Sequence, residues 1–307
     1  MEAPLTTIAS AVRAARVRPF ELSLQVALRK QLVALRGGPR PIATQLSQEG
    51  QSLRIEVLSR GPLEDAEVQQ AIDDACALTG IDEDPQDFAA VAQRHPLVAK
   101  LYDRFRGARL GRLPTVWQSF ATSVVEQLVT FGEAQHAVGR MRARFGLRVA
   151  EGLRAFPVAE VIAQVAPFEL RALGVGMRRA TTVILGARLG ERLERLRTIP
   201  IAEAMTWLQQ LKGVGPWTAN KVAIAALGHA DGVLVGDAGL PFVTTMALTG
   251  MAGGDAEMLE CLAPFAPHRA RVARLFDLAH VHLGSIPGVP RRRLPVIDPH
   301  RRTPWKY

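Results

Sequence analysis

The segment with the clearest chemical potential is a glycine-rich turn between two apolar, helix-like runs. It reads Leu-Lys-Gly-Val-Gly-Pro-Trp-Thr-Ala over residues 211–219. Glycine adopts positive φ freely, so Gly213 and Gly215 allow the chain to reverse sharply. Without side chains in the way, backbone N–H groups can approach a phosphate, and a helix that starts at Pro216 directs its dipole at the same anion. Such contacts grip a nucleic-acid backbone without reading its sequence, although many helical hairpins use glycines only structurally.

The second candidate for chemistry is Asp237, which ends the run Val-Leu-Val-Gly-Asp. A carboxylate beside a sugar can stabilise the oxocarbenium-like charge that develops when an N-glycosidic bond breaks, and it can orient or deprotonate water. An aspartate after a glycine is more commonly a turn residue or a helix N-cap. Both hypotheses for Asp237 stay open on the residues alone. Asp231, within Ala-Asp-Gly, looks like a loop residue.

Hydrophobic periodicity predicts a mainly α-helical protein with a small α+β N-terminal region over residues 1–90. Residues 22–28 and 53–58 read as strands, 37–39 as a turn, and 64–87 as acidic and helical. A compact helical body is predicted over 91–285, with short links between its helices. The tail, 286–307, is rich in Pro and Arg and is expected to be extended. The body's expected helices are 116–129, 133–145, 158–165, 167–173, 178–189, 201–211, 217–227, 258–262 and 267–283.

Composition favours a polyanionic partner for the helical body. The net charge is +9 overall. Residues 1–90 hold 9 Lys/Arg against 13 Asp/Glu, whereas the remainder holds 29 against 16. A basic segment of this kind fits nucleic acid, and it fits an Arg-rich genomic composition equally well. The seven histidines lack zinc spacing, so no metal centre is predicted, and no apolar run is long enough to predict a membrane span. Only two cysteines are present, which fits a reducing cytoplasm.

The hairpin string, with Asp237 at the expected distance after it, resembles the helix-hairpin-helix (HhH-GPD) superfamily of DNA glycosylases. Within it, the likeness is strongest to the bacterial DNA-3-methyladenine glycosylase II group, and it runs from about Val91 to Leu283. The segments Val-Glu-Gln-Leu-Val at 125–129 and Leu-Gly-Val-Gly at 173–176 carry it further. The resemblance implies a catalytic role for Asp237 and phosphate contacts from the hairpin, through Gly213, Val214, Gly215 and Thr218.

The resemblance also implies roles beside the flipped base. Bifunctional members carry a nucleophilic lysine where this chain has Trp217, so a monofunctional hydrolase is expected. Trp217 would either stack on an electron-poor base or fix the helix pair as a core residue. Lys221 stands where the group often has an aromatic, and a cation facing the pocket would repel a cationic base. Leu128 matches the wedge that fills the space of the extruded base, and Gln127 would brace its loop.

The expected function is monofunctional excision of damaged, alkylated purines from duplex DNA. The alternatives are a glycosylase for oxidised or deaminated bases and a catalytically inactive helix-hairpin-helix DNA-binding protein, which would tolerate loss of Asp237. No cofactor is expected to be required, and the resemblance allows a structural monovalent cation at the hairpin carbonyls. We expect a monomer that binds double-stranded DNA in the cytoplasm, associated with the nucleoid.

Overall fold

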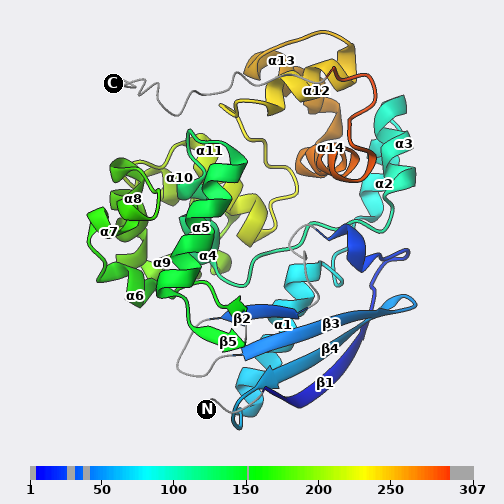
Figure 1. The fold of residues 1–307 in the computed structure, drawn as a ribbon. Coiled ribbons are helices and arrows are strands. Elements are labelled where there is room, and N and C mark those ends of the chain that lie inside the picture. The colour runs from blue at the N-terminus through cyan, green and yellow to red at the C-terminus, as the bar shows by residue number, and fades with distance from the viewer. Residues whose placement is uncertain (1–4, 26–31, 37–41, 151, 291–307) are drawn as a thin grey trace.

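The computed structural model describes residues 5–25, 32–36, 42–150 and 152–290. A four-stranded antiparallel sheet with one helix against it forms the N-terminal part, and two groups of helices form the rest (Figure 1). The first group, α4–α11, lies beside the sheet, and the second gathers α2, α3 and α12–α14 (Figure 1). The protein is therefore mainly helical, as the sequence predicted.

The sheet has the strand order β1-β4-β3-β2. Its strands are β1 (Thr6–Ala14), β2 (Leu32–Arg36), β3 (Ile42–Glu49) and β4 (Ser52–Ser59). In β4 every second side chain is buried, which is the pattern of a strand with one face toward a core. Helix α1 (Asp65–Thr79) packs against the sheet, and Glu64 with Glu67 closes a capping box at its start.

The first helical group contains the hairpin and its own apolar core. Phe120 on α4 and Ile184 on α8 are buried in this core. Its elements are α4 (Val116–Val125), α5 (Phe131–Phe145), β5 (Arg148–Ala150), β6 (Leu153–Arg154), α6 (Ala159–Ala163), α7 (Pro167–Ala172), α8 (Met177–Arg188), α9 (Gly190–Arg195), η2 (Leu196–Thr198), α10 (Ile201–Gln209), α11 (Pro216–Val222) and the π-helical turn η3 (Ala223–Leu227).

The second helical group has a separate core, in which Phe88 and Phe276 are buried. It contains α2 (Gln86–Ala92), α3 (Pro96–Arg104), α12 (Leu240–Thr249), α13 (Asp255–Leu262), η4 (Ala263–Phe265) and α14 (Arg269–Leu283). Because α3 packs with α14 and α2 packs with η4, segments almost 200 residues apart in the chain share this core. The boundary that we placed at residue 90 falls inside α2.

Two predictions at the element level were wrong. Leu22–Leu24, expected as the start of a strand, is the 3-10 turn η1 with Leu22 and Leu24 buried against the helices and the sheet; residues 26–28 lie outside the described part. The helix expected over 116–129 ends at Val125, because Leu128 has φ 55° and Thr130 caps the next helix. Strands β1, β2 and β3 were not predicted. The turn predicted at 37–39 and the tail from 291 onward also lie outside the described residues.

No helix within the described ranges is long and apolar enough to cross a membrane. Ile286 is buried, and Val289 packs against the second helical core. The first residues of the predicted tail therefore belong to the folded body.

The close approach of α4 and α8 predicts opposite effects for two glycine-to-alanine substitutions. A Cβ at Gly186 would lie 2.0 Å from Cε1 of Phe120, whereas one at the exposed Gly139 on α5 meets nothing within 4 Å. We expect Gly186→Ala to destabilise the fold by about 1–3 kcal/mol through overpacking. Gly139→Ala should stabilise it by about 0.5–1 kcal/mol through helix propensity. Urea unfolding of both variants measures this, and equal effects would contradict the packing.

Candidate functional site

The glycine turn joins α10 to α11 as a tight hairpin. Gly213 has φ +88°, a conformation that favours glycine, and a Cβ there would lie 2.3 Å from Oγ1 of Thr182 on α8. The Thr182 hydroxyl donates to the Lys212 carbonyl at 3.2 Å, so α8 holds the turn from behind. Gly215 precedes α11 and is exposed, with open space around its Cα. The sequence therefore placed the turn correctly, and Gly213 has a steric reason to be glycine.

A single amide side chain ties the turn after α4 to the hairpin. Gln127 Nε2 donates to the Gly213 carbonyl at 2.9 Å and to Thr218 Oγ1 at 2.8 Å. Arg179 on α8 donates to the Val125 carbonyl and holds the same turn from the other side. Next to Gln127, Leu128 is 87% exposed with φ 55°. It is not the core leucine that its residue type alone would suggest, and the surrounding bonds keep it in a costly left-handed conformation.

Asp237 accepts hydrogen bonds on both carboxylate oxygens. Its Oδ2 accepts from the Trp217 indole Nε1 at 3.0 Å. Its Oδ1 accepts from the backbone N–H groups of Gly239 at 2.9 Å and Leu240 at 2.8 Å, at the start of α12. The capping geometry that the sequence offered as one hypothesis is therefore present. The indole bond adds a link from the half-buried carboxylate to the second helix of the hairpin, which a simple cap does not have.

The loop that carries Asp237 consists mostly of small residues, and residues outside the loop hold it in place. The N–H of Gly236 donates to both carboxylate oxygens of Asp255, at 3.0 and 3.1 Å. Earlier in the same connection, Asp231 forms an ion pair with Arg269 at the start of α14, with 2.6 Å between Oδ2 and Nη2. Burial raises the pKa of the Asp231 carboxyl and the hydrogen bonds from Arg269 lower it more, so its pKa lies below the usual value. Asp231 is thus a structural residue of this loop.

Lys221 is turned toward Trp217 and is charge-paired. Its Nζ forms an ion pair with Glu126 and lies 4.8 Å from the centre of the Trp217 ring. Both partners are partly buried, with 30% of the Lys221 side chain and 13% of the Glu126 side chain exposed. One face of the indole therefore already carries a cation, whose charge Glu126 balances.

Asp277 on α14 is a second carboxylate near the site, and the sequence analysis did not single it out. Water reaches its side chain, but the surrounding protein desolvates the carboxyl and raises its pKa. The positive charges of Arg274 and Lys221 oppose this shift, and the negative charge of Asp237 adds to it. These electrostatic interactions show that α14 lies near Asp237 in the folded protein. No sequence signal marks Asp277, because only the fold places α14 beside the hairpin connection.

The structure brings together most residues that the sequence singled out. Gln127 contacts the hairpin, Trp217 contacts Asp237, and Lys221 lies over Trp217. Leu128 projects from the turn beside them. Within the part of the chain that the structure describes, no group of three His, Cys, Asp or Glu side chains could hold a metal ion.

Comparisons with known proteins find DNA glycosylases among the similar chains. No protein-family model matches the chain. It is 26% identical over 167 residues to a DNA-3-methyladenine glycosylase of Bacillus subtilis, covering 52% of this chain and 55% of that protein. It is 31% identical over 142 residues to DNA-3-methyladenine glycosylase 2 of Escherichia coli, covering 44% and 50%. The chain thus spans about half the length of the curated relatives that it matches.

The fold is that of a known glycosylase structure. The chain superposes on a 3-methyladenine DNA glycosylase from Archaeoglobus fulgidus with a TM-score of 0.76 and 21% identity, covering 91% of this chain and all of that one. The shared part therefore extends beyond the hairpin into the N-terminal region. The names of the relatives and this shared fold confirm the resemblance that the hairpin indicated.

The raised pKa of Asp277 predicts a specific pH dependence of stability. Its carboxyl is harder to ionise in the folded protein than in the unfolded chain. The wild type therefore loses stability as pH rises from about 4 through the folded-state pKa. Asp277→Asn cannot ionise, so it should gain stability relative to the wild type between pH 4 and 7 in urea unfolding. Asp65→Asn, at the exposed start of α1, controls for net charge. If the stability difference between Asp277→Asn and the wild type is the same at pH 4 as at pH 7, the raised pKa of Asp277 is contradicted.

Proposed function

We propose that this protein hydrolyses the N-glycosidic bond of alkylated purines in duplex DNA, as a monofunctional glycosylase of base excision repair. The observation that carries the proposal is the carboxylate of Asp237, which the Trp217 indole and the start of α12 hold beside the hairpin. The names of the relatives, DNA-3-methyladenine glycosylases, support the reaction class.

Asp237 would act on the sugar of the extruded nucleotide. Positive charge develops on that sugar as the base leaves, and a fixed carboxylate stabilises it without reorganising. The same group can orient the attacking water or take its proton. Because three hydrogen bonds fix the carboxylate, its position does not depend on side-chain packing around the small residues Gly236 and Ala238. Trp217 supplies no amine at the position of the bifunctional lysine, which supports hydrolysis without strand cleavage.

DNA binding would use the hairpin and the turn at Leu128 together. The N–H groups at Gly213 and Gly215 would grip a phosphate. The Val214 N–H already donates to the Leu211 carbonyl at 3.0 Å, and Thr218, buried at the start of α11, would support the turn through its bond to Gln127. Leu128 would enter the duplex and occupy the space of the flipped base. Its 87% exposure in a held turn supports this role. We also propose that the hairpin carbonyls hold a structural monovalent cation, since each carbonyl that accepts one hydrogen bond keeps a second lone pair.

The charges around Trp217 favour a cationic lesion such as 3-methyladenine or 7-methylguanine. Glu126 neutralises Lys221, which removes the repulsion that a free lysine would exert on such a base. The carboxylate of Asp237, bonded to the Trp217 indole, adds negative charge nearby. A base that already carries positive charge also leaves readily, so the site needs no strong general acid.

We propose a monomer as the active form.

Asp237→Asn tests the proposal directly, because it keeps the size of the side chain and removes its charge. The wild type should release 3-methyladenine or 7-methylguanine from methylated duplex DNA, measured by chromatography of free bases. The variant should release them about 10²–10⁴ times more slowly while still binding DNA. Asp65→Asn is the matched control. Undiminished release by Asp237→Asn would exclude this mechanism, and release of only oxidised or deaminated bases would exclude the lesion class.

Leu128 allows stability and activity to be separated. Leu128→Gly relieves a left-handed backbone that costs a leucine about 1 kcal/mol, and the exposed side chain contributes little to packing. We expect unfolding stability to be unchanged or raised, while base release falls because the wedge is lost. Leu128→Ala keeps the strained backbone and should lose activity without the gain in stability. Full base release by both variants would refute the wedge.

A further inference from the structure

Lys221 is a charged side chain of the candidate site that takes no part in the proposed hydrolysis. It lies on α11, one helical turn after Trp217, and its Nζ is 4.8 Å from the centre of the Trp217 ring. The same indole donates from its Nε1 to Asp237 Oδ2 at 3.0 Å. One aromatic ring therefore has at its edge the carboxylate that would face the sugar, and an ammonium group over its face.

The ammonium group of Lys221 is held by Glu126 but keeps hydrogens for a ligand. The two side chains form an ion pair in which Glu126, at the end of α4, is the more buried partner, with 13% of its side chain exposed against 30% for Lys221. An ammonium group has three N–H donors and no acceptor. Within the described ranges, Glu126 is the one hydrogen-bond acceptor of Nζ. The more exposed side of the pair is therefore a donor.

An extruded nucleotide would bring its base to this donor. The base is joined directly to the sugar carbon that Asp237 would face, so it lies within the length of one purine from the carboxylate. Trp217 contacts Asp237, and Lys221 covers one face of the indole. A purine on this face would either contact Lys221 or displace it from Glu126. Displacement would leave a mostly buried carboxylate without its cation, which is costly, so contact is favoured.

A donor at this point distinguishes purines by the group at position 6. Guanine derivatives carry a carbonyl oxygen there, which accepts a hydrogen bond, whereas adenine derivatives carry an amino group, which donates. As the bond between C1′ and N9 breaks, its electron pair passes to the base, and part of the negative charge reaches O6. A hydrogen bond from Lys221 to O6 then strengthens in the transition state, while the proton stays on the lysine.

We propose that Lys221 is a specificity-determining residue that donates to O6 of a methylated purine, so that the protein favours 7-methylguanine over 7-methyladenine and 3-methyladenine. This role rests on the proposed function, since it selects among the lesions of that reaction. Glu126 would be a positioning residue, because it holds the ammonium group and balances its charge against a cationic base.

Release of bases from duplex DNA treated with dimethyl sulfate tests this role, because that DNA contains all three lesions. 7-Methylguanine and 7-methyladenine carry the same methyl group and positive charge, and they differ at position 6 and in the 2-amino group of guanine. Lys221→Met in the full chain should release 7-methylguanine about 10–100 times more slowly than the wild type, as expected for a lost hydrogen bond from a charged donor. Release of the two adenine lesions should be unchanged or faster.

Two further variants separate the lysine donor from the ion pair. Lys221→Met leaves the Glu126 carboxylate unpaired, so the double variant Lys221→Met/Glu126→Gln should show the same selective loss of 7-methylguanine release without that charge. Glu126→Gln alone keeps the donor, and it should slow all three cationic lesions while the preference for 7-methylguanine remains. Lys100→Met, which removes an exposed lysine of α3, should match the wild type.

The wild type alone decides the matter if the variants fail to fold. After division by the uncatalysed rate of depurination, its single-turnover rate should be at least about tenfold higher for 7-methylguanine than for 7-methyladenine. Lys221 has no such role if this preference is absent, or if Lys221→Met slows all three lesions equally; the proposed function would then still stand. A wild type that releases none of the lesions overturns the proposed function, and the role of Lys221 with it.

Discussion

Three hydrogen bonds to one carboxylate fix the hairpin and α12 relative to each other. Trp217 reaches Asp237 from α11 in the first helical group, while the N–H groups of Gly239 and Leu240 reach it from the start of α12 in the second. The carboxylate is thus both a cap and a joint between two separately packed groups of helices. A substitution that loosened the packing of either helical group would shift the carboxylate of Asp237. The position of this carboxylate therefore depends on packing far from the site.

The local features of the site could be predicted because they depend on short-range chemistry. Gly213 must be glycine because its φ is positive and because Thr182 leaves no room for a Cβ. A proline begins α11, so the string of residues 211–219 marks the hairpin by itself. The position of Asp237 followed from the resemblance, whereas its bond to Trp217 did not, since no pattern in the sequence links these two residues. Lys221 looked like an unfavourable cation until the structure paired it with Glu126, 95 residues earlier.

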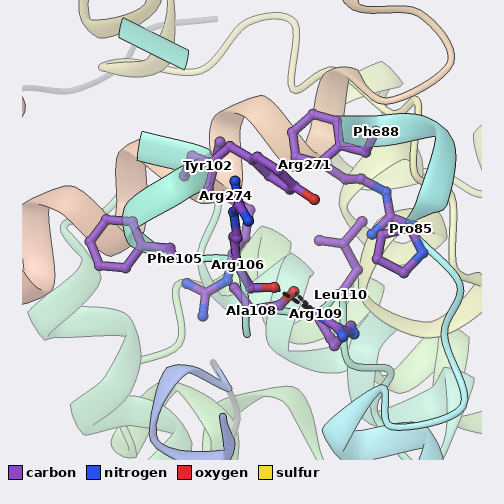
Figure 2. Close-up of a pocket in the computed structure, with 11 residues that line it drawn as sticks. Pro85, Phe88, Tyr102, Phe105, Arg106, Ala108, Arg109, Leu110, Arg271 and Arg274 are labelled. Atoms are coloured by element: carbon purple, nitrogen blue, oxygen red, sulfur yellow. Dashed lines mark hydrogen bonds between the residues drawn. The ribbon is translucent and has the colours of Figure 1, made fainter. Parts of the chain in front are cut away.

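The errors share one physical cause, which is that tertiary contacts override local pattern. Leu22 and Leu24 alternate as in a strand, but their burial in different cores suits a 3-10 turn. Hydrophobic periodicity alone predicted a helix through residue 129, whereas the hydrogen bonds of Gln127 and Arg179 hold the chain after Val125 in a turn. Arg106, Arg109, Arg271 and Arg274 line one pocket (Figure 2) but belong to segments more than 160 residues apart, so the sequence shows them only as scattered positive charge. Asp277 was missed for the same reason.

The amide of Gln127 has a consequence for how the protein would follow a double helix. It joins the turn of Leu128 to the carbonyl of Gly213, so hydrogen bonds hold the projecting leucine and the hairpin together. Under the proposed function, the separation between the gripped phosphate and the disturbed base step is then a constant of the fold. The protein would then test each nucleotide at the same distance from the bound phosphate, whatever base is present.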